Sequence, residues 1–275
     1  MNIIESKVER VIEQISKSTK EADVLRRGFY KKYPYSVSNI VSHLKTPFDK
    51  DKIANKTHDL HFDDPKSIYY KKSVEEIIEM WDKKAETGRA NGVALDDFIG
   101  LILDDNASDD VLDDYKSGFS ETIQKKCDSY YKFYNSSIKD KLTFLCREQV
   151  LVHPDLKVNG RFDAMFYYNS NILLMDWKNT EKIANSNKFS KMLGPLYSYD
   201  DCELNSYTMQ VYIYKYILRN VYHLYDVNIV PLIVQVGQKD VKTYQPIIEY
   251  SDKLVEDCID YAVSQIDRER AEMNK

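Results

Sequence analysis

Two acidic side chains and a lysine occur in neighbouring segments that both have the pattern of strands. The first segment contains Gly160-Arg161-Phe162-Asp163, and the second ends in Asp176-Trp177-Lys178. Because side chains alternate along a strand, Asp176 and Lys178 project from the same face. An even-numbered hairpin loop would pair position 163 with 176 or 178 and would add Asp163 to that face. Two carboxylates and a lysine are therefore expected to converge at the end of a sheet.

Such a cluster has two chemical interpretations. Clustered carboxylates repel each other, and burying them without partners is costly. Carboxylate oxygens are ligands that a hard cation such as Mg²⁺ selects. A bound cation can activate water and polarise a phosphoryl oxygen, and a nearby ammonium group can stabilise developing negative charge. The other interpretation is a salt bridge on a solvated sheet face, because Asp-x-Lys is a common sequence.

The first half of the chain has the periodicity of helices. Apolar residues recur in steps of three and four over 73–85 and 110–134. Residues 45–70 lose this period, gather proline, aspartate and lysine, and predict a loop. No flexible linker is visible. We therefore expect a helical region over 1–140 that packs on a core over 141–275, as one compact domain.

From about residue 142 the pattern changes from helix to strand. Three strands are expected over 142–153, 158–168 and 172–179, with a polar turn between the last two. The elements expected after them are a long helix, two more strands and a closing helix, over 204–225, 228–236, 241–249 and 252–270. Strands flanked by helices predict an α/β or α+β fold.

The order of these motifs resembles the PD-(D/E)XK nuclease superfamily, in which an Asp precedes a hairpin and Asp/Glu-x-Lys closes the next strand. The similarity is greatest to the RecB-type and phage exonuclease-like branch, whose later helix bears Gln-x-x-x-Tyr. In this chain the order over residues 145–220 is Gly160-x-x-Asp163, Asp176-Trp177-Lys178 and Gln210-x-x-x-Tyr214. The resemblance implies a restriction-endonuclease-like core, in which a mixed central sheet is flanked by helices.

The resemblance also implies roles for the central residues. Asp163 and Asp176 would hold Mg²⁺ with help from the Trp177 carbonyl, and Lys178 would position or activate the attacking water.

The helix motif has a less direct role. Gln210 and Tyr214 are spaced i,i+4, share one helix face and would steady the site or the nucleic acid. Their alternative is an ordinary place at the rim of the core.

Two further acidic residues extend the expected metal set. Glu148 lies on the strand before Asp163, where related exonucleases often place an additional acid; it is a ligand or a surface partner of Arg147. Asp96, in Gly92-Val93-Ala94-Leu95-Asp96, takes the position of the metal-binding His in the family's Gly-Thr-x-x-His. A carboxylate can still serve a hard cation, but the change leaves open this ligand and any preference for Mn²⁺. The alternative for Asp96 is an exposed position on a helix.

Basic residues near the Asp-x-Lys strand are candidates for contacts with nucleic acid. Lys182, Lys188 and Lys191 follow that strand directly, and two tyrosines lie nearby in the sequence. Such a loop can hold a single strand by charge and stacking. Arg161 is a fourth candidate, although most charge clusters are solvated faces. The net charge of −5 excludes a uniformly basic surface, so any contact must be local.

The composition narrows the class of protein further. The four cysteines include no close pair of the kind found in zinc knuckles, redox dithiols or iron–sulfur sites. The N-terminus lacks an apolar signal segment, and no apolar run is long enough to span a bilayer. A cytoplasmic protein without membrane association is therefore expected. A gene from a phage with an AT-rich genome would fit the Lys, Tyr, Ile and Asp content, and would place it in the host cytoplasm.

Together the residues and the resemblance predict a Mg²⁺-dependent deoxyribonuclease, with Mn²⁺ as an alternative metal. We expect an exonuclease that acts on DNA ends or single strands in recombination, repair or replication, with a helicase or single-strand-binding protein as a partner. One alternative is a site-specific or structure-specific endonuclease of the same superfamily. The other is a non-catalytic nucleic-acid-binding or assembly protein, which would have no need of clustered acids beside a phosphate.

Overall fold

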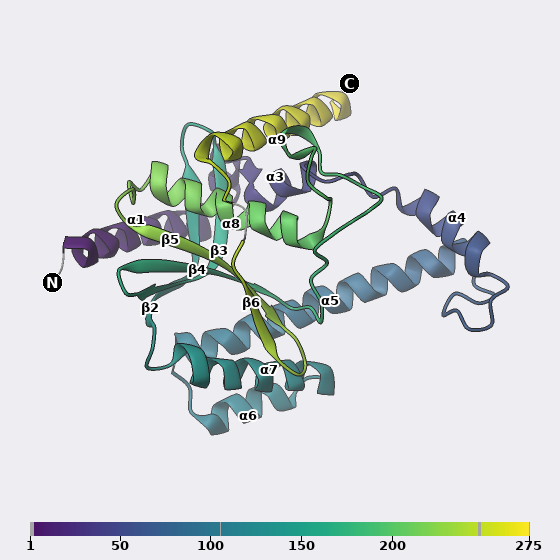
Figure 1. The fold of residues 1–275 in the computed structure, drawn as a ribbon, viewed down its shortest axis with the longest axis horizontal. Coiled ribbons are helices and arrows are strands. Elements are labelled where there is room, and N and C mark those ends of the chain that lie inside the picture. The colour runs from purple at the N-terminus through teal and green to yellow at the C-terminus, as the bar shows by residue number, and fades with distance from the viewer. Residues whose placement is uncertain (1–2, 105, 247–248, 275) are drawn as a thin grey trace.

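The computed structural model describes residues 3–104, 106–246 and 249–274, and contains one mixed sheet between two groups of helices (Figure 1). The strands are β1 (Tyr35–Ser36), β2 (Thr143–His153), β3 (Val158–Tyr168), β4 (Asn171–Lys178), β5 (Asn228–Val236) and β6 (Val241–Tyr244). They are ordered β1-β3-β4-β5-β6, and β2 pairs with β3. β1 with β3 and β4 with β5 are parallel pairs, and the other pairs are antiparallel. The mixed sheet flanked by helices confirms the predicted fold class.

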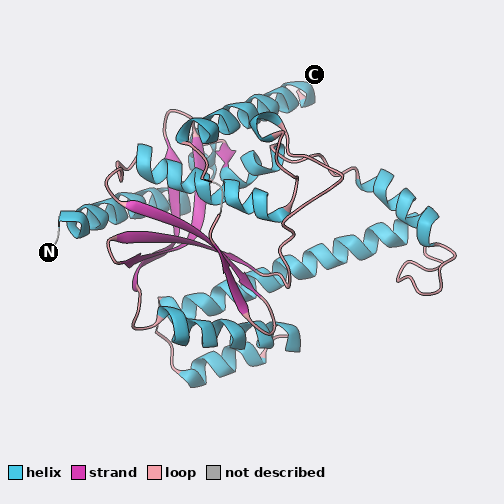
Figure 2. Ribbon diagram, in the orientation of Figure 1, coloured by secondary structure: helices cyan, strands magenta, loops and turns pink. Residues whose placement is uncertain are grey.

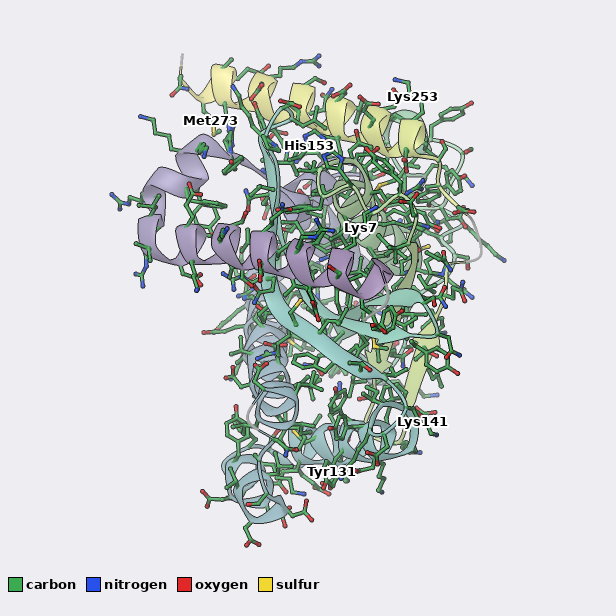
Figure 3. All side chains as sticks on the ribbon, turned by 90° about the vertical axis from the view of Figure 1, so that its left-hand side faces the viewer. Lys7, Tyr131, Lys141, His153, Lys253 and Met273 are labelled. Atoms are coloured by element: carbon green, nitrogen blue, oxygen red, sulfur yellow. The ribbon has the colours of Figure 1, made fainter. Side chains whose placement is uncertain are left out.

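Helices cover both faces of the sheet (Figures 1 and 2). Those that contribute to the core on one face are α1 (Ile3–Leu25), α3 (Val37–His43), α8 (Glu203–Asn220) and α9 (Asp252–Met273). On the other face lie α5 (Val74–Leu103), α6 (Asp109–Ser117) and α7 (Glu121–Phe133). Seen from the side in Figure 3, Lys253 on α9 and Tyr131 on α7 lie at opposite ends of the molecule. The sheet is therefore the middle layer, and it carries the residues of interest.

The remaining helical segments are short. They are α2 (Arg27–Lys32), α4 (Lys50–His61), a π-helical turn over Tyr134–Ile138 and a 3₁₀ turn over Gly194–Leu196.

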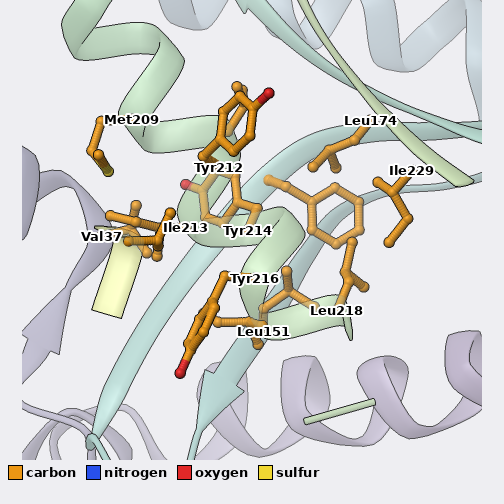
Figure 4. Close-up of a cluster of buried hydrophobic side chains, with 14 of the residues drawn as sticks. Val37, Leu151, Leu174, Met209, Tyr212, Ile213, Tyr214, Tyr216, Leu218 and Ile229 are labelled. Atoms are coloured by element: carbon orange, nitrogen blue, oxygen red, sulfur yellow. The ribbon is translucent and has the colours of Figure 1, made fainter. Parts of the chain in front are cut away.

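The larger core forms around α8. Side chains are buried at consecutive positions from Val211 to Leu218, so this helix is enclosed on all sides, as expected for a helix inside a domain. Figure 4 shows its residues against Leu174 of β4 and Ile229 of β5, together with Val37 from α3. The α8 helix is thus held rigidly beneath the strands whose ends carry the Asp-x-Lys motif.

Two helix predictions were wrong in part. A helix, α4, occupies much of 45–70, where a loop was predicted. It begins after Asp49, whose side chain accepts a hydrogen bond from the Lys52 backbone N–H, and it packs on α5 through the fully buried Ala54. The stripe over 110–134 is two helices, because α6 ends at Ser117 and α7 begins after Ser120. The start of α4 depends on its cap and on tertiary packing, which apolar spacing does not encode.

The C-terminal elements also differ in length from the prediction. The helix predicted to reach residue 225 ends at Asn220, and the last strand ends at Tyr244; residues 247 and 248 of that predicted strand lie outside the described residues.

The structure also bears on the cysteines and on the possibility of membrane-spanning helices. The four cysteines are all buried and free. Among the described helices, none is both long and apolar enough to cross a membrane.

Candidate active site

The candidate site lies where β3 and β4 separate. Their pairing ends at Ala164 and Met175, whereas the pairing of β4 with β5 continues to Lys178 and Gln235. β4 therefore extends beyond the point at which β3 leaves it, and an opening forms beside the Asp-x-Lys motif.

The hairpin that joins these strands has a two-residue loop. Tyr168 pairs with Asn171, and the intervening Asn169 and Ser170 both have positive φ, 47° and 65°. This is the backbone of a tight hairpin turn, which polar residues such as Asn tolerate. The loop is even-numbered, as the prediction required, and extending the register by one pair places Asp163 opposite Asp176.

Side chains replace the ladder hydrogen bonds that are lost at the opening. The Asp163 carboxylate accepts a hydrogen bond from the Trp177 backbone N–H at 2.6 Å. The Tyr214 hydroxyl donates to the Arg161 carbonyl at 2.8 Å. Because buried backbone groups need partners, these two side chains stabilise the separated strands as well as lining the site.

A buried ion pair lies at the centre of the site. The Lys178 Nζ is 2.5 Å from the Asp176 Oδ2, and Asp176 is only 2% exposed. Burial lowers the pKa of Lys178, but the charges of Asp176 and Asp163 outweigh this effect and hold the pKa above its usual value. The other Asp176 oxygen, Oδ1, is buried and has no hydrogen-bond partner in the described part of the chain. The lysine is therefore a fixed positive charge beside an acid with unused bonding capacity.

Residues of α8 hold the lysine in place. The Lys178 Nζ donates to the Gln210 Oε1 at 3.1 Å, and the Gln210 Nε2 donates to the Tyr214 hydroxyl at 3.3 Å. The Tyr207 ring lies under the same ammonium, with its centroid 4.5 Å from Nζ. The structure thus brings Gln210 and Tyr214 to Lys178. Sequence reasoning missed Tyr207, although its i−3 spacing from Gln210 is a usable signal.

Asp163 lies in a cavity of about 200 Å³ between the sheet and α5. The residues that line it are Gly92, Leu95, Asp96, Ile99, Glu148, Asp163, Trp177 and Asn179. Asp163 lines this cavity beside Trp177, and Lys178, which was expected to share a face with it, contacts α8.

The two acids remain close enough to affect each other. Burial, and next the negative charge of Asp176, raise the pKa of Asp163 well above its usual value, although Lys178 acts in the opposite direction.

Glu148 and Asp96 share the cavity with Asp163. Glu148 lies between the pairs Arg147–Ala164 and Gln149–Phe162, and so stands opposite Asp163 with a positive φ of 51°. Burial, and next the charge of Asp96, raise the pKa of Glu148 to about 7. This left-handed backbone is uncommon for a glutamate and marks a constrained position beside the site.

The Asp96 carboxylate already has a partner. Arg147 Nη2 lies 2.8 Å from the Asp96 Oδ2, and Arg147 Nη1 lies 2.9 Å from the Asp104 Oδ2. Arg147 therefore bridges Asp96 of α5 and Asp104, which directly follows this helix, so the Asp96 carboxylate is already paired.

The basic candidates divide into two groups. Arg161 Nη2 lies 2.7 Å from the Asp23 Oδ1, and the Lys191 Nζ lies 2.6 Å from the Asp200 Oδ1. Lys182 and Lys188 are exposed and have no ion-pair partner within the ranges that the structure describes. These two lysines are the ones whose charge is available to an anionic ligand.

The chemistry of the site can be compared with the needs of a metal ion. Among the described residues, no three His, Cys, Asp or Glu side chains are grouped as a ready-made metal site. However, the unpartnered Asp176 Oδ1 and the raised pKa of Asp163 mark two carboxylates that lack sufficient positive charge nearby. A hard cation with oxygen ligands would supply that charge, so the residues present fit one.

Close packing explains why the first position of the Gly-x-x-Asp motif, Gly160, is a glycine. A Cβ at this position would lie 2.6 Å from the Tyr214 Cε1 and 2.6 Å from the Val37 Cγ2. Both neighbours belong to the buried cluster of Figure 4. The glycine therefore allows the Tyr214 ring to pack directly on β3, where its hydroxyl reaches the Arg161 carbonyl.

Replacing Gly160 with alanine is expected to lower the free energy of unfolding by about 1–3 kcal/mol, because the new methyl group would overpack the cluster. Urea denaturation followed by circular dichroism measures this change. Gly88→Ala is the matched control, because a Cβ at Gly88 meets nothing within 4 Å and alanine favours the helix interior. An unchanged stability of Gly160→Ala would contradict the close packing described above.

Three comparisons were made with known proteins: with protein families, with curated proteins and with solved structures. No protein family and no curated protein matches this sequence. The chain is similar to the crystal structure of a protein from Eubacterium rectale named "Putative exonuclease", with 13% identity, a TM-score of 0.42, and coverage of 87% of this chain and 80% of that one. At this level the likeness carries no argument about activity, so the functional proposal rests on the site itself.

Proposed function

We propose that this protein is a Mg²⁺-dependent deoxyribonuclease that hydrolyses phosphodiester bonds, with Mn²⁺ as a second usable metal. The observation that carries the proposal is the Lys178 ammonium, fixed 2.5 Å from the buried Asp176 carboxylate at the opening between β3 and β4. Asp163 lines a cavity at the same opening. Clustered acids beside a fixed cation suit phosphoryl chemistry, whereas a module that only binds phosphate has no use for the acids.

The proposed roles follow from the contacts. Asp163 and Asp176 would hold the metal, with the Trp177 carbonyl and Glu148 as further oxygen donors. When bound, Mg²⁺ supplies positive charge that polarises a phosphoryl oxygen and favours ionisation of a water molecule. Lys178 would orient the attacking water and stabilise negative charge that develops on the phosphate.

The residues of α8 would support this lysine. Gln210 accepts from the Lys178 Nζ and is itself bonded to Tyr214, whose hydroxyl is anchored to the β3 backbone. The chain of hydrogen bonds limits the rotamers of the lysine, so the charge is oriented before substrate binds.

We further propose that the enzyme acts on DNA ends or single strands, as an exonuclease in recombination, repair or replication. The long helix α5 forms one wall of the cavity through Gly92, Leu95, Asp96 and Ile99. Such a wall favours access by a single strand over access by a continuous duplex. The unpaired Lys182 and Lys188 would contact the strand as it leaves the site.

The preference for ends can be tested with two DNA substrates. We expect linear DNA to be degraded and covalently closed circular DNA to be spared, in parallel reactions with Mg²⁺ resolved on agarose gels. The spared circle, linearised with a restriction enzyme and returned to the reaction, serves as its own control. Nicking of the closed circle as fast as the linear DNA is lost would instead favour an endonuclease.

A further inference from the structure

A buried lysine on α7 contacts the segment that follows the Asp-x-Lys strand. Lys126 is 5% exposed, and its Nζ donates to the Asn179 Oδ1 at 2.7 Å and lies 3.1 Å from the Glu181 Oε1. Lysine is almost never fully buried unless it is paired, because removing an ammonium group from water is costly. This lysine therefore fixes the two residues that it contacts, and Asn179 comes directly after Lys178 in the chain.

The contact also determines which way the Asn179 amide points. Lysine has only donors, so the atom it contacts must be the amide oxygen, and the amide nitrogen must point elsewhere. No acceptor in the described part of the chain contacts the Asn179 Nδ2, and this atom is not among the buried polar atoms that lack a partner. The Nδ2 is thus not fully buried and makes no hydrogen bond within the described residues.

Asn179 lies at the candidate site. It lines the same cavity as Asp163, Glu148 and Trp177. If Asn179 served only to connect α7 to the loop, hydrogen bonds from both its amide oxygen and its amide nitrogen would stabilise that connection more. Here the acceptor end is held by Lys126, and the donor end remains available beside the acids that are proposed to hold the metal.

We propose that Asn179 is a phosphate-binding residue, whose Nδ2 donates to a non-bridging oxygen of the nucleic-acid strand, and that Lys126 is the positioning residue that orients it. The inference rests on the proposed function and adds to it a direct contact between Asn179 and the nucleic-acid strand. A neutral donor suits this place, because hydrogen bonds to a charged phosphate oxygen are strong and a second ammonium group would compete with the metal.

The test uses nucleic-acid binding, so that it does not depend on turnover. In a Lys178→Ala background, the affinity for a fluorescein-labelled single-stranded oligonucleotide is measured by fluorescence anisotropy in Mg²⁺. We expect Asn179→Ala to weaken binding about tenfold. Asn179→Asp should weaken it further, because this side chain still accepts from Lys126 but offers phosphate no donor. Asn55→Ala and Asn55→Asp are the matched controls, at an exposed position of α4 away from the site, and should leave affinity unchanged.

The role of Lys126 is tested by a double-mutant cycle. Lys126→Met should weaken binding when Asn179 is present and should have no additional effect in Asn179→Ala, because the lysine acts through the amide. A purely structural lysine would weaken both proteins equally and would overturn the positioning role. Unchanged affinity in Asn179→Ala, with tight binding by its parent, would overturn the inference while leaving the proposed function intact. A parent that binds no nucleic acid, together with a wild type that cleaves none, would overturn both.

Discussion

Replacement of Lys178 with alanine is expected to lower kcat by at least about 100-fold. The ammonium group is held by Asp176 and Gln210 in one orientation, and its proposed work is done in the transition state. The affinity for DNA should therefore change little. Steady-state kinetics on an end-labelled oligonucleotide, with affinity measured separately by anisotropy, distinguishes the two quantities.

Lys182→Ala is the matched control for this prediction. Lys182 is exposed, lies four residues later and is proposed to contact only the strand, so its loss should raise KM and leave kcat nearly unchanged. A Lys178→Ala protein with near-normal kcat and reduced affinity would show that Lys178 is a phosphate clamp. Circular dichroism should accompany the kinetics, because Lys178→Ala leaves the buried Asp176 without its partner.

Asp163→Asn and Asp176→Asn should each lower activity by at least about 100-fold and weaken the binding of a divalent cation. Each change removes one of two carboxylate charges that share a single nearby ammonium group, that of Lys178. Isothermal titration with Mn²⁺ measures the metal affinity independently of turnover. Asp155→Asn is the control, because Asp155 is exposed in the turn between β2 and β3 and should alter neither quantity. Normal Mn²⁺ affinity in both site variants would place the metal elsewhere or exclude it.

The sheet and its hairpin could be predicted from local chemistry. Short apolar segments separated by polar turns mark β2 to β4, and the Asn-Ser pair supplies the positive φ values of the tight turn. The helix α4 could not be predicted from periodicity, because it depends on the Asp49 cap and on the packing of Ala54.

The residues of the candidate site could be predicted from the sequence, but the contacts between distant elements that position them could not. Spacing placed Gln210 and Tyr214 on one helix face, and the structure brings that face to Lys178. The two-residue loop fixes the register that sets Asp163 opposite Asp176, whereas the separation of β3 from β4 beside Asp163 is a tertiary feature. The ion pair of Arg147 with Asp96 and the contact of Lys126 with Asn179 join elements that are distant in sequence, 51 and 53 residues apart, and neither leaves a local signal.

The most direct test is cleavage of end-labelled linear DNA by wild-type protein and by Lys178→Ala, purified in parallel, with Mg²⁺, with excess EDTA, and with Mg²⁺ restored after EDTA. We predict products with Mg²⁺, none in EDTA, recovery when Mg²⁺ is restored, and at least about 100-fold slower cleavage by Lys178→Ala with Mg²⁺. Cleavage by the wild type that persists in excess EDTA would contradict a metal-dependent site at Asp163 and Asp176. So would a folded wild-type protein that cleaves neither single-stranded nor duplex ends with Mg²⁺ or Mn²⁺.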